Sequence, residues 1–313
     1  MRRVTDGSAI RLDQTTPFST EARAQPLGRS GTVDDMVRVR GSNPAYFDEA
    51  GQAKAIEKYY AGATPAENRS DPHKALSRLL ESTHTNRLDY REARHHYLYP
   101  IVDVHPDGKL RGVYTGISYD PPELRLSELT AEYRFGDRNP AVTDRDAGMA
   151  NAVDGTRNAV RVNPRFNCEH SVPQSWFKKK LPMKADLHCL FTADPDCNGM
   201  RGNKTFDESG DERGVPCGVT RGDRFEPARN KGAVARATLY FLVRYPGIIS
   251  RANLPEDSID ELLRWHHDDP PSVWEKHRTQ EIEKAQGNRN PFIDHPDWAD
   301  AIDFSRGLKG GRR

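Results

Sequence analysis

Two short segments of this sequence combine the residue types that hydrolysis of a phosphodiester bond needs. Glu169 and His170 are adjacent in NPRFNCEHSVPQSWF, and Asn198 lies in DLHCLFTADPDCNGMRGN. Histidine is the side chain whose ordinary pKa suits a general base near neutral pH. Magnesium accepts one carboxylate and one amide oxygen because it keeps several of its waters. The two segments therefore predict a general base, His170, and a pair of metal ligands, Glu169 and Asn198.

Basic residues in the same region are candidates for contacts with phosphate. If NGMRGNKTF is a helix that begins at Asn198, after the turn formed by Asp194, Pro195 and Asp196, then Arg201 lies one turn further on the same face. From there its guanidinium would hold a phosphate with two hydrogen bonds. A cluster of lysines lies nearby, at Lys178, Lys179, Lys180 and Lys184. Such a cluster is usually a solvated surface, and the net charge of +1 adds no argument for nucleic acid.

Each site residue also has an ordinary structural explanation when it is taken alone. A single histidine in a half-buried strand is usually packed or at the surface. An asparagine such as Asn198, which follows Asp-Pro-Asp-Cys, is more often a helix cap than a metal ligand.

Four cysteines, Cys168, Cys189, Cys197 and Cys217, lie in and around the same segment. None of them forms a CxxC pair, and their spacings fit no common zinc site, so a structural zinc site is the weaker alternative. Two disulfides would form in an oxidising compartment, whereas free thiols are expected in a reducing cytosol. The sequence favours disulfides slightly.

Apolar residues at helical spacing predict helices on both sides of this segment. The pair Asp71-Pro72 suits the start of a helix over DPHKALSRLLESTHT, and LDYREARHHYL is expected to form a second. Further helices are expected from near Pro227 or Lys231 through LYFLVRYP, in ISRANLPEDSIDELLRWHHDD, and in SVWEKHRTQEIEKAQG, which Gly287 would end. A short helix is expected near the end of the chain.

The β-rich runs Ile101–Val104 and Gly112–Thr115 flank Pro106-Asp107-Gly108 and predict a hairpin. Residues 119–160 are polar throughout and are expected to form a long, loosely structured connection. The expected fold class is therefore α+β, mostly helical with a small β element near the site.

The chain of 313 residues is expected to contain one folded domain over residues 71–305. Residues 1–70, rich in Gly, Pro, Ser, Thr, Arg and Asp, are expected to be a poorly ordered extension, with a short helix over 53–63. Residues 306–313 form a basic tail. No apolar run is long enough to span a membrane, and the first residues do not have the apolar core of a secretory signal peptide.

Taken together, the motifs resemble those of the bacterial endonuclease I family, whose members are ββα-metal (His-Me finger) nucleases. The resemblance covers roughly residues 72–305 and includes YPIVDVHPDGKLRGVYTG, KGAVARATLYFLVRYP and AQGNRNPFIDHP. The matching residues of the site are Asn167, Glu169, His170, Pro173, Ser175, Trp176, Asp186, Leu187, His188, Leu190, Asn198, Arg201 and Asn203.

The resemblance implies an enzyme that cleaves DNA, often RNA too, with little sequence preference. It implies His170 as the base that activates water, and Glu169 and Asn198 as ligands of one Mg²⁺ or of another divalent cation such as Mn²⁺ or Ca²⁺. Arg201 is the candidate for phosphate contact. Asp186, His188 and Asn203 are candidates for orienting these groups, with structural hydrogen bonding as the alternative.

A signature of the resemblance near the end of the chain comprises Gln286, Asn288, Arg289 and Asn290. A hydrogen-bonded turn explains these residues at least as well as substrate contact does.

Two other functions remain open. The chain could be a ribonuclease on the same scaffold, or a catalytically silent nucleic-acid-binding protein, although the latter would be expected to lack His170, Glu169 or Asn198. Members of the family are often secreted or periplasmic, yet no signal peptide is visible here, so the localisation stays open. If the protein is cytosolic, we expect an inhibitor protein or another restraint to protect the genome of the host.

Overall fold

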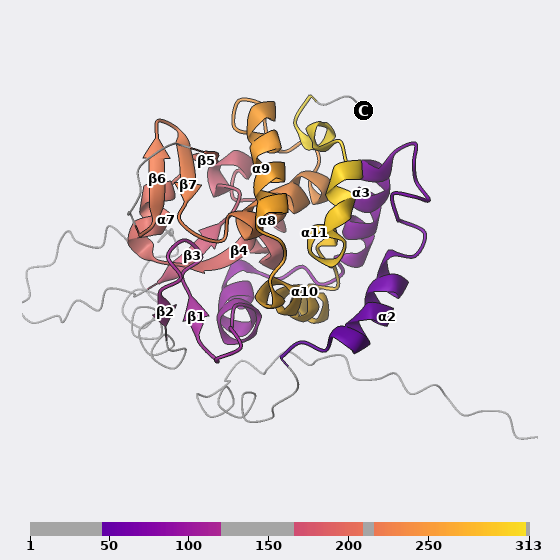
Figure 1. Ribbon diagram of the computed structural model, residues 1–313, viewed down its shortest axis with the longest axis horizontal. Helices are drawn as coiled ribbons and strands as arrows, with labels where there is room; N and C mark the ends of the chain where they lie inside the picture. The colour runs from indigo at the N-terminus through magenta and orange to yellow at the C-terminus, as the bar shows by residue number, and fades with distance from the viewer. Residues whose placement is uncertain (1–45, 120–165, 209–215, 311–313) are drawn as a thin grey trace, which may run out of the picture.

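The computed structural model describes residues 46–119, 166–208 and 216–310, and helix α8 (Lys231–Arg244) lies at its centre. Nearly every residue of α8 is buried, as expected for the helical run KGAVARATLYFLVR, which is mostly apolar or small, and the burial includes Arg236 and Arg244. Helix α9 (Glu256–Asp268) and helix α3 (Pro72–Thr83) pack against it. Figure 1 shows the small β strands on one side of α8 and α3 on the other.

The remaining helices and strands surround this centre. The helices are α2 (Glu49–Tyr60), α4 (Tyr90–Glu92), which continues as a π-helix (Ala93–Val102), α7 (Pro195–Arg201), α10 (Val273–Gln286) and α11 (Pro291–Asp294). The strands are β1 (Leu110–Arg111), β2 (Ser118–Tyr119), β3 (Asn167–His170), β4 (Leu190–Ala193), β5 (Thr205–Phe206), β6 (Gly218–Arg221) and β7 (Arg224–Pro227). Short 3₁₀ helices cover Gln174–Phe177, Met183–Ala185, Leu187–Cys189, Pro296–Ala301 and Phe304–Gly307. This content confirms the expected α+β class.

The helix boundaries follow the signals in the sequence. Asp71 accepts a hydrogen bond from the backbone of Lys74 at the start of α3, with Pro72 as the first helical residue. Ser272 and Glu275 form a reciprocal capping box at the start of α10. Gly287, with a φ of 96°, ends α10 in the left-handed conformation that glycine adopts readily.

Part of the expected N-terminal extension packs on the body of the protein. Residues 1–45 lie outside the described residues, but α2 covers most of the short helix expected over 53–63. Tyr60 at its end is almost fully buried and donates a hydrogen bond to Asp294 of α11. The packed body therefore begins before Asp71.

The expected hairpin over residues 101–115 is wrong in both strands, because residues 113–115 of its second run form the turn between β1 and β2. Ile101 and Val102 belong to the π-helix, and the antiparallel pair is formed by β1 and β2 instead. Val102 and Leu98 are both fully buried, four residues apart, so burial of one helical face overrides the β propensity of the run. The expected connection over residues 119–160 falls almost wholly outside the described residues.

An antiparallel pair of strands followed by a helix carries the site segment. Glu169 of β3 lies opposite Phe191 of β4, and α7 begins two residues after β4. Helix α7 starts at Pro195, which corrects the expected start at Asn198, because proline suits the first helical position. Asn198 therefore lies inside the helix and is not its cap.

The four cysteines form neither two disulfides nor four free thiols, the two arrangements expected from the sequence. Cys197 of α7 and Cys217, next to β6, form a disulfide, while Cys168 and Cys189 are buried thiols. The Sγ atoms of these two thiols lie near the backbone carbonyls of Glu169 and Ala237, respectively. The four cysteines therefore do not form one zinc site. Where the structure describes the chain, no helix combines the length and apolar character required to cross a bilayer.

Candidate active site

Glu169 and His170 are consecutive residues of strand β3, in the interior of the protein. The strand pairs along its whole length with β4, with Cys168 opposite Thr192 and His170 opposite Leu190. Glu169 and His170 are only 2% and 5% exposed. A buried carboxylate beside a buried imidazole requires partners that are fixed by the fold.

The hydrogen bonds of His170 define which ring nitrogen is protonated. Its Nε2 lies 3.0 Å from the backbone carbonyl oxygen of Lys184, which can only accept, so Nε2 carries the proton. In the neutral ring, Nδ1 is then the atom with a lone pair. The side-chain amide of Gln174 lies 3.3 Å from this Nδ1 and donates to it. The neutral form of His170 can therefore accept a proton at Nδ1.

Two side chains bind the same oxygen of Glu169. Tyr114 donates to Oε1 at 2.6 Å, and Nη1 of Arg201 donates to it at 2.7 Å. Within the described part of the chain, Oε2 has no such side-chain donor. Burial raises the pKa of Glu169, while the charge of Arg201 and the hydrogen bond from Tyr114 oppose this shift.

Helix α7 presents Asn198 to β3. The amide nitrogen of Asn198 donates to the side-chain oxygen of Asn167 at 2.9 Å and to the backbone carbonyl of Cys168 at 3.2 Å. Both donated bonds use the nitrogen, which leaves the amide oxygen as an acceptor for a cation. Cys168 precedes Glu169 directly, so Asn198 lies against the strand that carries Glu169 and His170.

These donors fit a magnesium ion better than a transition metal. Glu169 and Asn198 supply hard oxygen ligands, and Mg²⁺ fills the rest of its shell with water and substrate oxygens. Zinc would need more nitrogen or sulfur ligands. Over residues 46–119, 166–208 and 216–310, no group of three or more His, Cys, Asp or Glu side chains could hold a metal.

Arg201 lies in the interior, on the inner face of α7. The residue is 1% exposed, and besides Glu169 its guanidinium binds the backbone carbonyls of His170 at 2.7 Å and Ser171 at 2.6 Å. The ring of Phe206 lies 4.3 Å below the guanidinium carbon. These contacts give Arg201 a positioning task at the end of β3. A direct contact with substrate phosphate stays a prediction.

Asp186 and His188 lie deeper in the protein, in a network with the helices around α8. Asp186 accepts hydrogen bonds from Tyr240, Tyr245 and Gln286. His188 binds the backbone carbonyl of Asn288, and burial lowers its pKa to about 4. The contacts of both residues are with structural groups of the core.

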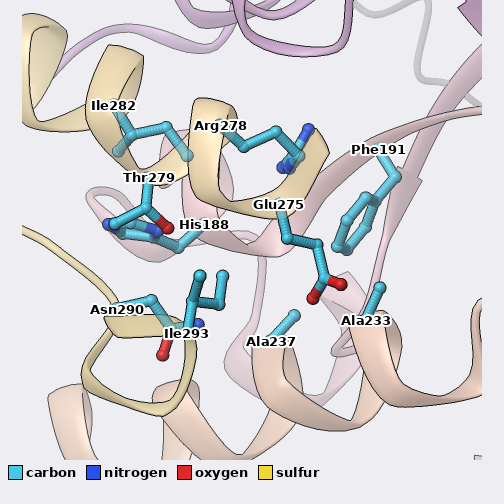
Figure 2. A pocket seen from close by; sticks show the side chains of 10 residues that line it. All are labelled: His188, Phe191, Ala233, Ala237, Glu275, Arg278, Thr279, Ile282, Asn290 and Ile293. Atoms are coloured by element: carbon cyan, nitrogen blue, oxygen red, sulfur yellow. The ribbon is translucent and has the colours of Figure 1, made fainter. Parts of the chain in front are cut away.

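His188 also borders an internal cavity between α8, α10 and α11. Figure 2 shows His188, Glu275, Thr279 and Asn290 among the side chains around it. The cavity measures about 10 Å³, which is the room of one water molecule. A nucleotide cannot enter a space of this size, so this cavity is not a substrate site.

The other candidate positions have structural partners too. Asn203 accepts a hydrogen bond from Ser175 at 3.1 Å and thereby ties the end of α7 to the turn after His170. The four residues of the C-terminal signature are at most 1% exposed, and their side chains bind other buried groups: Gln286, Asn288, Arg289 and Asn290. The hydrogen-bonded turn is therefore the correct interpretation of that signature.

Three groups of the site were not predicted. Tyr114 lies far from Glu169 in sequence, and no spacing rule connects them. The carbonyl of Lys184 belongs to the backbone, which a sequence pattern does not reveal. Gln174 follows His170 closely, yet only the 3₁₀ turn Gln174–Phe177 brings its amide back to the ring.

Comparison with known proteins gives one matching family and several relatives. The family model described as Endonuclease I matches residues 139–297. An extracellular ribonuclease of Bacillus amyloliquefaciens is 40% identical over 132 residues, which cover 37% of this chain and 46% of that protein. A periplasmic deoxyribonuclease of Aeromonas hydrophila is 34% identical over 140 residues, or 42% of this chain and 53% of that protein.

A third relative, an extracellular deoxyribonuclease of Aeromonas hydrophila, is 31% identical over 167 residues, which cover 44% of this chain and 69% of that protein. The chain spans about half the length of the first two of these curated relatives. The matched family segment contains β3, β4 and α7, and therefore every residue assigned above to the base and ligand positions.

Proposed function

This chain belongs to the endonuclease I family, and on that premise we propose that it is a metal-dependent, sequence-nonspecific endonuclease that hydrolyses phosphodiester bonds of DNA. Its strand pair β3–β4 and helix α7 would form the ββα-metal motif. One observation carries the proposal more than any other. His170, with Nδ1 as its proton acceptor, follows Glu169 in β3, Asn198 of α7 lies against the same strand, and the remaining oxygens of Glu169 and Asn198 suit one divalent cation.

In the proposed reaction His170 acts as general base. Its Nδ1 takes a proton from the water that attacks the phosphorus atom, while Nε2 keeps its own proton and its hydrogen bond to the carbonyl of Lys184. That carbonyl also stabilises the positive charge that the ring acquires. A fixed tautomer means that no ring rotation is needed before proton transfer.

Glu169 and Asn198 are the proposed ligands of the metal. A bound divalent cation would neutralise the charge that develops on the phosphate and on the leaving oxygen. The chain itself holds the two ligands in place. Tyr114 and Arg201 fix Oε1 of Glu169, while Asn167 and the carbonyl of Cys168 fix the amide of Asn198.

Low sequence preference follows from the kind of contact that this site can make. Specific DNA readers place a helix or ribbon against base edges, whereas contacts to phosphate carry no sequence information. Helix α7 is short, and its inner face is used to hold β3. We therefore expect cleavage throughout a duplex, suppressed by high salt.

The test is incubation of the purified protein with supercoiled plasmid in the presence of Mg²⁺ or EDTA. We expect a smear of products with Mg²⁺ and intact plasmid with EDTA, and the same assay with Mn²⁺ and Ca²⁺ would define the cation. Cleavage that persists in EDTA would contradict the proposed metal site. A few sharp bands from a long duplex would contradict the proposed lack of sequence preference.

A ribonuclease is the second candidate, because one of the relatives above is named as a ribonuclease. Attack by an activated water does not use the 2′-hydroxyl group, so the site would accept either polymer. Matched single-stranded DNA and RNA of one sequence, digested under identical conditions, would separate the candidates. A silent binding protein is the third, and cleavage of either polymer would reject it.

Arg201 provides a test of how the site is held. A lysine at this position has one compact ammonium group and cannot bind Glu169 and two carbonyls together. We expect Arg201→Lys to lower the activity per folded molecule about 10-fold to 100-fold and to raise the Mg²⁺ concentration required for half-maximal rate. Titration of Mg²⁺ in the plasmid assay measures both effects. An unchanged Mg²⁺ requirement with a raised KM for DNA would instead favour phosphate contact.

A further inference from the structure

Two cations gather around one aromatic ring next to the proposed base. The ring of Tyr90 lies 5.3 Å from the imidazole of His170, measured between ring centroids. The ammonium nitrogen of Lys184 and the guanidinium carbon of Arg94 each lie 4.4 Å from the centre of the Tyr90 ring. Tyr90 begins α4, Arg94 follows in the π-helix, and Lys184 belongs to the 3₁₀ helix Met183–Ala185.

This arrangement fixes Lys184 at both of its ends. Its backbone carbonyl accepts the Nε2 proton of His170, so the residue cannot move away from the base without breaking that bond. Its side chain rests on Tyr90 through a cation–π contact, which holds the ammonium group against the ring that neighbours His170. Where the structure describes the chain, Lys184 has no carboxylate within salt-bridge distance.

Besides the proposed metal, the site needs positive charge for the other phosphates of its substrate, and Arg201 is not available to bind them. The substrate is a polyanion, and the scissile phosphate must lie close to His170 for the water to attack it. Arg201 is buried, and its charge is balanced by Glu169. A cation whose position is already fixed beside His170 would bind phosphate at a small cost in side-chain entropy.

We propose that Lys184 forms a phosphate-binding subsite beside His170, where its ammonium group binds a phosphate of the substrate strand next to the scissile one, with Arg94 as a second cation of the same subsite. This inference rests on the proposed nuclease function. It assigns to Lys184 a binding role in addition to the backbone contact that orients the base.

A nearby loop offers a competing surface for the same phosphates. Lys178, Lys179 and Lys180 are exposed. The backbone φ angles of Lys178 and Lys179 are 57° and 56°, values that residues other than glycine rarely adopt. These three lysines follow the 3₁₀ turn that carries Gln174. They could attract nucleic acid without any defined subsite, so an experiment must distinguish them from Lys184.

The measurement is DNA binding by the full chain in EDTA, with a fluorescein-labelled single strand of about 12 nucleotides as probe. Fluorescence anisotropy gives the Kd at a series of KCl concentrations. Each phosphate contact contributes about 0.7 to the slope of log K against log salt for a single strand. We expect Lys184→Met to reduce that slope by about 0.7 and to weaken binding at low salt about tenfold.

Substitutions of Lys184 and of a distant lysine control for loss of folding and for loss of charge in general. Methionine keeps the apolar stem that packs on Tyr90, and the thermal unfolding midpoint of each variant reports whether the fold is intact. Lys184→Arg should restore the slope of the wild type because it restores the charge. Lys74→Met removes an exposed lysine on α3, across the molecule from β3 and α7 in Figure 1, and should leave the slope unchanged.

A slope for Lys184→Met equal to that of the wild type would overturn the subsite. The subsite would also be overturned if the slope fell only in a variant in which Lys178, Lys179 and Lys180 are all replaced by methionine. Plasmid cleavage by the wild type with Mg²⁺ is scored separately. If the wild type cleaves plasmid but the slope does not depend on Lys184, only the subsite is rejected. If the slope depends on Lys184 but the wild type does not cleave plasmid, only the nuclease function is rejected.

Discussion

Replacement of His170 by alanine should lower the rate of plasmid cleavage about 10²-fold to 10⁴-fold, the range in which a general base contributes to catalysis. The loss should lie in kcat, because His170 contributes a proton acceptor and no phosphate contact. Nδ1 is the acceptor by virtue of the bond between Nε2 and the carbonyl of Lys184. The measurement is the initial rate of supercoil loss at saturating Mg²⁺.

A second substitution separates chemistry from packing. The His170 ring contacts Tyr90 and Phe177, so an alanine also removes packing. His170→Gln fills more of the space and keeps an amide that can donate to Lys184, but an amide accepts no proton near neutral pH. We expect His170→Gln to be nearly as inactive as His170→Ala and closer to the wild type in thermal stability.

The matched control is His267→Ala on α9. His267 is half exposed and pairs with Asp300 at the surface, so its loss should leave the cleavage rate within about twofold of the wild type. If His170→Ala retained most of the rate while DNA binding was intact, another group would have to be the base. The assignment of Nδ1 would then be wrong even if the chain cleaves DNA.

The sequence predicted most helices because their signals are local. Asp71 and Pro72, Ser272 and Glu275, and Gly287 each act within one turn of the helix end that they define. The grouping of Glu169, His170 and Asn198 in one segment also follows from local patterns, and the structure places them on β3 and α7, while their roles as base and ligands stay predictions. Such short-range patterns do not depend on the rest of the fold.

The features that the sequence did not predict depend on contacts between distant residues. Val102 continues a helix because Leu98 and Val102 share a buried face, although the local run favours a strand. Tyr114 reaches Glu169 only when the β1–β2 region packs on β4. Arg201 was expected to share a helix face with Asn198 and to contact phosphate, whereas the packing of α7 on β3 directs its side chain to Glu169 and to backbone carbonyls.

Replacement of Asp186 by alanine should lower the free energy of unfolding by about 3–5 kcal/mol, as the removal of one partner from a buried charged network does. Asp186 is fully buried. Its Oδ2 accepts from Tyr240 and Tyr245, both at 2.8 Å, and its Oδ1 accepts from Gln286 at 2.8 Å. Alanine would remove the acceptor that these three donors share in the interior, and of the three only Gln286 would keep another acceptor, Asn288. Urea unfolding followed by circular dichroism measures the loss.

Two further variants test whether the lower free energy of unfolding of Asp186→Ala comes from its lost hydrogen bonds. Asp186→Asn keeps one acceptor oxygen, so we expect a loss of about half the size. Asp107→Ala removes an exposed carboxylate, 43% accessible, that pairs with Arg111, and such surface pairs contribute about 1 kcal/mol or less. A loss for Asp186→Ala no larger than that for Asp107→Ala would contradict a structural role for the Asp186 network.

The same variants decide between the two roles that the sequence left open for Asp186. The carboxylate caps the 3₁₀ helix Leu187–Cys189, which leads directly into β4, and it joins that turn to α8 and α10. If Asp186 acts only through folding, Asp186→Asn should retain the cleavage rate of the wild type per folded molecule at a temperature well below its unfolding midpoint. If it also orients the site, the rate should fall by more than the unfolded fraction explains, because β4 is the partner strand of Glu169 and His170. The network ends in buried side chains of the core, so we expect the first result.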